Sequence, residues 1–201
     1  MGATVTQPRS RSSAQRGFTL VETTIAIVIL MVGVLTIVAV FATAIASTQN
    51  AQENLIARQK AEETLESIFT ARNTQQINFS QIANISSGGI FTDGAVQLFA
   101  AGPDGLVNTA DDIPFPANGV CPAGPECIPL PGPDGILGTA DDVAMSLANF
   151  TRQIQINPVL EADGVTVDPN LKQITVTVAY TTGGSPAPRS YSVNALISSF
   201  R

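Results

Sequence analysis

The sequence contains no histidine and no tryptophan among its 201 residues. Without histidine it cannot build a serine–histidine–aspartate triad, a histidine metal site or an imidazole acid–base pair. Charged residues are also scarce, at 13%, whereas hydrophobic residues reach 44%. This scarcity of charge indicates that part of the chain avoids water, and the length suits one modest domain with an anchor.

The charges that are present are divided by sign along the chain. The net charge is −6 at pH 7, yet residues 1–17 carry Arg9, Arg11 and Arg16 and no acidic residue. The body that follows is therefore acidic, which makes it a poor electrostatic partner for nucleic acid. We expect no nucleic-acid ligand.

An uncharged segment of 22 residues runs from Ile25 to Ala46, with Thr36 and Thr43 as its only polar side chains. As a helix it would be about 33 Å long, enough to cross a bilayer core of about 30 Å. Because the basic residues precede it, we expect a cytoplasmic N-terminus and an exported body. Hydropathy alone leaves open a cleaved secretory signal or a plain signal anchor.

The junction before this segment is more specific. Residues 16–22 read RGFTLVE, and Glu22 is the single charge between Phe18 and Gln52. The combination of a basic leader, Gly-Phe, a Glu four residues on and a long apolar run resembles the processing site of type IV prepilins and type II secretion pseudopilins. The resemblance implies that a prepilin peptidase cuts between Gly17 and Phe18, and that Phe18 becomes an N-methylated N-terminus.

The resemblance also gives Glu22 a role in assembly. A carboxylate at mid-bilayer costs roughly 2.5–3.5 kcal/mol on insertion scales, so it needs a partner. In that family the partner is the N-terminal ammonium of a neighbouring subunit. The alternative is that Glu22 lies near the headgroups, where its charge stays hydrated.

The predicted fold is α+β, with a long N-terminal helix packed on a C-terminal antiparallel sheet, as in pilins. We expect the helix over residues 19–71, because an apolar stripe continues beyond the membrane segment. Strands are expected at 150–156, 173–180 and 190–198, with a further candidate at 94–100. Turn residues lie at 163–164 and 183–186. The stripe consists of Ala57, Ala61, Leu65, Ile68 and Phe69.

Five regions follow from this interpretation. They are a cytoplasmic leader (1–17), a transmembrane and assembly helix (18–46), its amphipathic continuation (47–72), a loop-rich insert (73–147) and the C-terminal strands (148–201).

The insert contains an internal repeat. Gly102–Asp112 reads GPDGLVNTADD and Gly132–Asp142 reads GPDGILGTADD, which agree at 8 of 11 positions. Tight turns could bring the first aspartate of each copy back to the last pair, and Ca²⁺ prefers such oxygen ligands. We therefore predict calcium loops, although aspartates that only cap turns would give the same pattern. The candidate ligands are Asp104, Asp111, Asp112, Asp134, Asp141 and Asp142.

Two cysteines, Cys121 and Cys127, lie between the copies in the segment CPAGPEC. In an exported domain they favour a disulfide, with free thiols as the alternative. A zinc site is disfavoured, because there are only two thiols and no histidine.

The sequence favours a structural role over an enzymatic one. It shows no nucleophile–base pair and no phosphate loop, so we expect the protein not to be an enzyme. The resemblance implies a minor pilin, or pilus-modification protein, that joins a filament with other pilins. Absence of proline from residues 19–71 supports a minor pilin or pseudopilin, because many major pilins carry one in this helix.

Two alternatives remain. The chain could be a type II secretion pseudopilin. Alternatively its head, by which we mean the part of the chain that follows the membrane segment, could be stabilised by calcium and act as an adhesin displayed on a pilus. In each case we expect a single-pass protein of the bacterial inner membrane, with its head in the periplasm and then at the surface in a pilus or pseudopilus.

Calcium binding gives the first testable prediction. Ca²⁺ should raise the melting temperature of the head, because it would neutralise and cross-link the carboxylates of each loop. The double variant Asp111→Ala, Asp141→Ala should lose that effect. A calorimetric titration without heat, together with an unchanged melting temperature, would refute the prediction.

Overall fold

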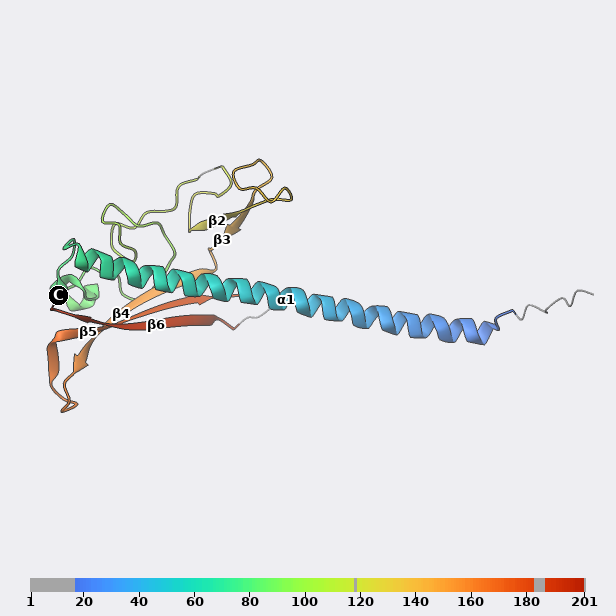
Figure 1. Ribbon diagram of the computed structural model, residues 1–201, viewed down its shortest axis with the longest axis horizontal. Coiled ribbons are helices and arrows are strands. Elements are labelled where there is room, and N and C mark those ends of the chain that lie inside the picture. The colour runs from blue at the N-terminus through green and yellow to red at the C-terminus, as the bar shows by residue number, and fades with distance from the viewer. Residues whose placement is uncertain (1–16, 118, 183–186, 201) are drawn as a thin grey trace, which may run out of the picture. The chain divides into compact units, whose positions relative to one another are not determined.

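The computed structural model describes residues 17–117, 119–182 and 187–200 (Figure 1). The chain forms two compact units, with the division between Ala46 and Ser47. One α-helix, α1 (Leu20–Asn73), begins in the first unit and ends in the second.

In the first unit, α1 is an uninterrupted helix whose side chains are exposed and almost all apolar. It is long and apolar enough to cross a membrane. The two hydroxyls between Ile25 and Ala46 do not present unpaired donors to lipid. Thr36 donates to the carbonyl oxygen of Gly33 at 2.7 Å, and Thr43 donates to that of Val40 at 2.8 Å. The predicted segment is therefore compatible with a hydrocarbon environment along its whole length.

In the second unit, α1 buries one stripe. Ala57, Ala61 and Ile68 of the predicted stripe are completely buried, and Leu65 and Phe69 are partly buried. The buried stripe also includes Thr64, Ala71 and Arg72.

The main sheet has four antiparallel strands in the order β1-β4-β5-β6. Its strands are β1 (Ala95–Gln97), β4 (Phe150–Leu160), β5 (Val167–Tyr180) and β6 (Arg189–Ser198). The buried residues of β4 and β5 and those of α1 form one core. This architecture confirms the predicted α+β fold of a long helix and a C-terminal antiparallel sheet.

Period-2 alternation decides which side chains of the sheet enter the core. Phe150, Ile154 and Ile156 of β4 point inward, as do alternate residues of β5 that end at Tyr180. The Phe150 and Tyr180 rings stack with centroids 5.3 Å apart. The Asn54 amide of α1 donates to the Tyr180 hydroxyl at 3.2 Å, which fixes the helix against this edge of the core.

The strands extend further than their sequence patterns indicate. β4 continues past Pro158 to Leu160, and the register with β5 shifts between Pro158 and Val159. Proline fits there because β1 pairs only with residues 151–153 of β4, so its missing N–H breaks no ladder bond with β1. Gly164 has a φ of 71° in the β4–β5 turn, as the Asp-Gly signal predicts. The predicted turn at 183–186 lies outside the described residues.

The insert contains more structure than its composition predicts. It has two short 3₁₀ helices, η1 (Phe79–Gln81) and η2 (Ile85–Ser87), besides β1. A separate two-stranded antiparallel sheet forms between β2 (Cys127–Leu130) and β3 (Val143–Ser146). The second acidic repeat is the connection between those two strands.

Candidate assembly segment and the polar sites of the head

The helix begins directly after the predicted cleavage point. Gly17 and Phe18 precede α1, and the Phe18 side chain is 81% exposed. The Thr19 hydroxyl oxygen accepts a hydrogen bond from the backbone N–H of Glu22 at 3.2 Å. Such a contact caps the first turn of a helix. Thr19 therefore starts the helix one residue after the predicted mature N-terminus, a role that our sequence analysis missed although the Thr-x-x-Glu spacing carries the signal.

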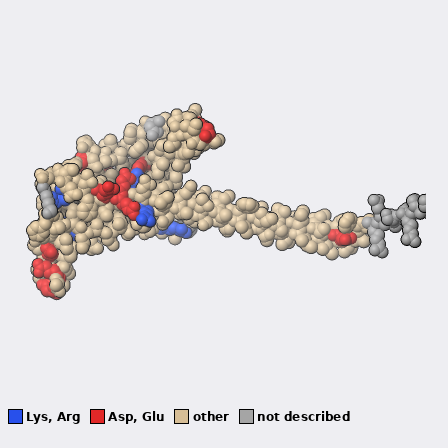
Figure 2. Space-filling view, in the orientation of Figure 1, with Lys and Arg blue, Asp and Glu red and all other residues tan. Residues whose placement is uncertain are grey.

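Glu22 is exposed in the first turn of α1. A carboxylate is favourable there, because the helix dipole places partial positive charge at the N-terminus. The remaining surface of this part of α1 is almost entirely uncharged (Figure 2). Glu22 is thus the one strongly polar group available for pairing along an apolar surface.

The two acidic repeats fold into loops with matching hydrogen bonds. In the first, Asp111 Oδ2 accepts from the backbone N–H of Asp104 at 3.2 Å. In the second, Asp141 Oδ2 accepts from that of Asp134 at the same distance. Each loop therefore brings its first aspartate back to the last pair, as the sequence predicts.

The third carboxylate of each loop closes a second turn. Asp112 accepts from the N–H of Asn108 at 2.8 Å, and Asp142 accepts from that of Gly138 at 2.7 Å. Asn108 and Gly138 occupy the same position, with φ values of 61° and 92°. Asparagine and glycine are the residues that best tolerate this left-handed conformation, which explains why this non-identical position is still restricted.

Both loops open with a glycine, and steric crowding explains why. A Cβ at Gly102 would lie 2.2 Å from the carbonyl oxygen of Asp111, and one at Gly132 would lie 2.1 Å from that of Asp141. Any larger residue would force the two ends of the loop apart.

Hydrogen bonding and burial shift the carboxylate pKa values in different directions. The Thr109 hydroxyl lowers the pKa of Asp111, and the Thr139 hydroxyl lowers that of Asp141. These contacts stabilise the fold above the ordinary aspartate pKa, and their contribution is lost as the pH falls through the lowered value. Burial raises the pKa of Asp112, so protonation of that group opposes the loss.

The loops differ in their surroundings. In the first copy Leu106 is 1% exposed and Asn108 is fully buried, where it exchanges hydrogen bonds with Arg152. In the second copy Ile136 and Leu137 are 60% and 59% exposed. The first loop is therefore part of the core, and the second lies on the surface.

Calcium binding by the loops stays a prediction. Among residues 17–117, 119–182 and 187–200, no group of three or more acidic or sulfur side chains converges in a metal-binding arrangement. The carboxylates instead hold the turns of their own loops. Asp112 Oδ1 already accepts two hydrogen bonds from Thr109, whereas Oδ2 of Asp111 and of Asp141 each accept one backbone N–H and retain a lone pair for coordination.

The predicted disulfide is confirmed. Cys121 and Cys127 are joined, and both side chains are buried. Glu126 precedes Cys127 in the loop that the bridge closes. Its backbone N–H donates to the carbonyl oxygen of Leu98 at 2.7 Å. The Glu126 carbonyl accepts from the N–H of Leu147 at 2.9 Å. The disulfide therefore lies next to a junction at which the Glu126 backbone joins Leu98, directly after β1, to Leu147, directly after β3.

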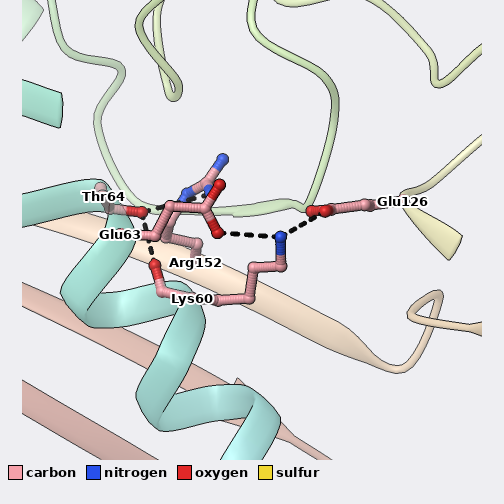
Figure 3. A network of polar contacts seen from close by, with 5 residues as sticks. All are labelled: Lys60, Glu63, Thr64, Glu126 and Arg152. Atoms are coloured by element: carbon pink, nitrogen blue, oxygen red, sulfur yellow. Dashed lines mark hydrogen bonds and ion pairs between the residues drawn. The ribbon is translucent and has the colours of Figure 1, made fainter. Parts of the chain in front are cut away.

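Glu126 pairs with a lysine of the helix (Figure 3). The Lys60 ammonium contacts Glu126 and, at 3.0 Å, Glu63. Burial alone would lower the pKa of Lys60, but the hydrogen bonds that its ammonium donates to Glu126 and Glu63 outweigh burial and raise that pKa. The lysine therefore remains charged at neutral pH, and it links the insert to α1.

Arg152 occupies an inward position of β4 and is only 3% exposed. Its Nε donates to Asn108 Oδ1 at 2.6 Å, and its Nη1 donates to the Thr64 hydroxyl at 3.3 Å. Burial lowers the pKa of Arg152, and the nearby charges of Asp112 and Glu126 oppose that shift. Sequence reasoning missed this residue, although β4 alternation places it on the same face as Phe150.

Comparison with known proteins bears on the N-terminal segment. A family model described as the prokaryotic N-terminal methylation motif matches residues 12–38, which include Gly17, Phe18 and Glu22. No curated protein and no solved structure gives a significant match to the chain. The match ends before the head, so the head must be interpreted from its own contacts.

The disulfide generates the second prediction. Replacing both cysteines by serine (Cys121→Ser, Cys127→Ser) should lower the free energy of unfolding of the head by about 2 kcal/mol, because a short closed loop restricts the unfolded chain. Amide hydrogen exchange should increase at Glu126 and Leu147, and tyrosine fluorescence of the buried Tyr180 can report global unfolding.

A reducing agent provides the matched control. It should destabilise the native protein by a similar amount and leave the serine variant unchanged. Equal amide exchange rates at Glu126 in the native protein and in the serine variant would show that the bridge does not hold this junction.

Proposed function

We propose that this chain, a type IV prepilin-like protein, is a minor subunit of a pilus-like filament. The methylation motif and the long apolar helix support a type IV pilin or pseudopilin subunit that is processed by prepilin peptidase and assembles with other pilins. Such a role requires no catalysis by the chain itself. The proposed route is insertion in the inner membrane, with the head in the periplasm, and then transfer into the filament.

The observation that carries this proposal is the placement of Glu22. It lies four residues after Phe18, and no other charge occurs between Phe18 and Gln52. Cleavage after Gly17 would create an ammonium group at Phe18. In an apolar environment an unpaired carboxylate and an unpaired ammonium are both costly, so pairing between neighbouring subunits offsets both costs.

The minor role is proposed in preference to a major one because residues 19–71 contain no proline. The pseudopilin of a type II secretion system is the alternative. It shares the same anchor, and the genes that neighbour this one would distinguish the two systems.

Calcium is proposed only as a stabiliser of the head. Two loops with equivalent hydrogen bonds support this idea, because both bring the backbone of the first aspartate to a carboxylate of the last pair. An adhesive role would need a ligand site in the head as well.

The third prediction tests assembly through Glu22. The variant Glu22→Gln should be processed and retained in the membrane, but it should be depleted from sheared filaments by about tenfold or more, because the ammonium of its neighbour loses its counter-charge. Immunoblots of the membrane and filament fractions, with intact mass to verify cleavage, would measure this.

Thr24→Val is the matched control. It removes an exposed hydroxyl two residues away that donates only to carbonyl oxygens of its own helix turn, those of Leu20 at 3.1 Å and Val21 at 2.8 Å. This variant should assemble normally. If Glu22→Gln entered filaments as efficiently as Thr24→Val, the proposed pairing would be wrong.

A further inference from the structure

A cavity of about 250 Å³ lies in the head between α1 and the insert. It is smaller than the roughly 300–1,000 Å³ of pockets that hold drug-sized ligands, so it suits a single small molecule or one unit of a larger one. Its walls combine half-buried aromatic rings with charged and hydroxyl side chains. The polar and aromatic lining residues are Lys60, Glu63, Thr64, Phe99, Glu126 and Arg152, together with Ser67 and Phe115.

One donor in this wall has no protein acceptor. Nη2 of Arg152 is buried and lacks a hydrogen-bond partner among the described residues, whereas Nε and Nη1 are both bonded. A buried guanidinium N–H without an acceptor is costly, and such groups in native proteins need an explanation. Nη2 exposes less than 1 Å² of surface, so a small shift of a neighbouring side chain in the wall brings it within reach of a ligand oxygen, which would satisfy it.

The charge of the wall argues against an anionic ligand. The cations Lys60 and Arg152 are accompanied by the carboxylates Glu63 and Glu126, and Asp112 also acts on Arg152. Negative charge is therefore in slight excess, which would repel a phosphate or carboxylate. The lysine is moreover already bonded to Glu63 and Glu126.

The hydrogen-bonding pattern instead fits hydroxyl groups. The Arg152 N–H needs an acceptor, while Glu63 and Glu126 each have one oxygen that Lys60 does not use. A hydroxyl group can accept from a guanidinium and donate to a carboxylate at the same time. The rings of Phe99 and Phe115 supply apolar surface for C–H groups of the same ligand.

We propose that this cavity binds a neutral sugar unit, with hydroxyls between Arg152 and the two glutamates and one face of the ring against the phenylalanines. The proposal does not depend on whether the chain belongs to a pilus or to a secretion system. It assigns the head a carbohydrate ligand, which an assembly role does not require.

The backbone of the cavity wall is fixed before any ligand enters. Phe115 exchanges backbone hydrogen bonds with Gly124, at 2.6 and 3.1 Å. Gly124 lies in the loop that the Cys121–Cys127 disulfide closes. Ala100 and Ile113 exchange a second pair, both at 3.1 Å. A preformed site of this kind reduces the ordering cost of binding a small, weakly bound ligand.

Saturation-transfer NMR on the full chain tests the proposal, in a detergent without a sugar headgroup. The probes are glucose, galactose and N-acetylglucosamine, with glucuronate as an anionic comparison. At least one neutral sugar should receive saturation, and it should do so more strongly than glucuronate.

Two variants separate binding from stability. Glu63→Gln should weaken binding of that sugar about tenfold, because a hydrogen bond to a charged acceptor is lost. Ala101→Trp should abolish binding, because Ala101 lines the cavity and is partly exposed. Glu62→Gln is the matched control: its carboxylate pairs with Arg58, outside the cavity, and binding should be unchanged.

Melting temperatures of all variants would be compared with that of the native chain to verify folding. Absence of saturation on every neutral sugar would overturn the proposal, as would stronger binding of glucuronate. Binding that persists in a folded Ala101→Trp protein would place the sugar elsewhere and would equally overturn it.

Discussion

The structure depends on the need to keep one uncharged helical surface out of water. From Ile25 to Ala46 the helix exposes apolar side chains on every side, and even its two hydroxyls bond back to the helix. Such a surface is stable only in lipid or against other helices of the same kind. In the proposed filament, Glu22 at the start of this surface would pair with the N-terminal ammonium of a neighbouring helix and so fix the register between the two.

In the head, the insert must be held in place by specific contacts, because it has little regular structure of its own. Tight turns capped by aspartates and a disulfide hold the insert together. The Lys60–Glu126 contact joins it to α1. The two acidic repeats illustrate how context changes the use of one motif. The same turns bury Leu106 in the first copy and leave Ile136 exposed in the second. The cavity arises where this irregular segment meets the helix, and its polar lining contrasts with the apolar core on the other side of Arg152.

Much of the fold could be predicted because it rests on simple periodicity. The spacing of Ala57, Ala61 and Ile68 identified the buried face of α1, and alternation identified the C-terminal strands. The β2–β3 sheet could not be predicted in this way. Its strands are only four residues long, one contains Pro129, and their pairing depends on the intervening repeat. The buried role of Arg152 could not be predicted for another reason. Alternation along β4 places its side chain inward, but only the structure shows that Asn108 and Thr64 accept its hydrogen bonds there.

We infer that residues 18–46 form a processed assembly helix and not a generic membrane anchor. Intact mass and peptide mapping of the protein purified from the membranes of its native host would measure this. Processing predicts a chain that begins at Phe18 with one added methyl group on its N-terminal nitrogen. A chain that begins at Met1, or at a cleavage site elsewhere, would contradict it and would leave the apolar segment as an ordinary signal anchor or signal peptide.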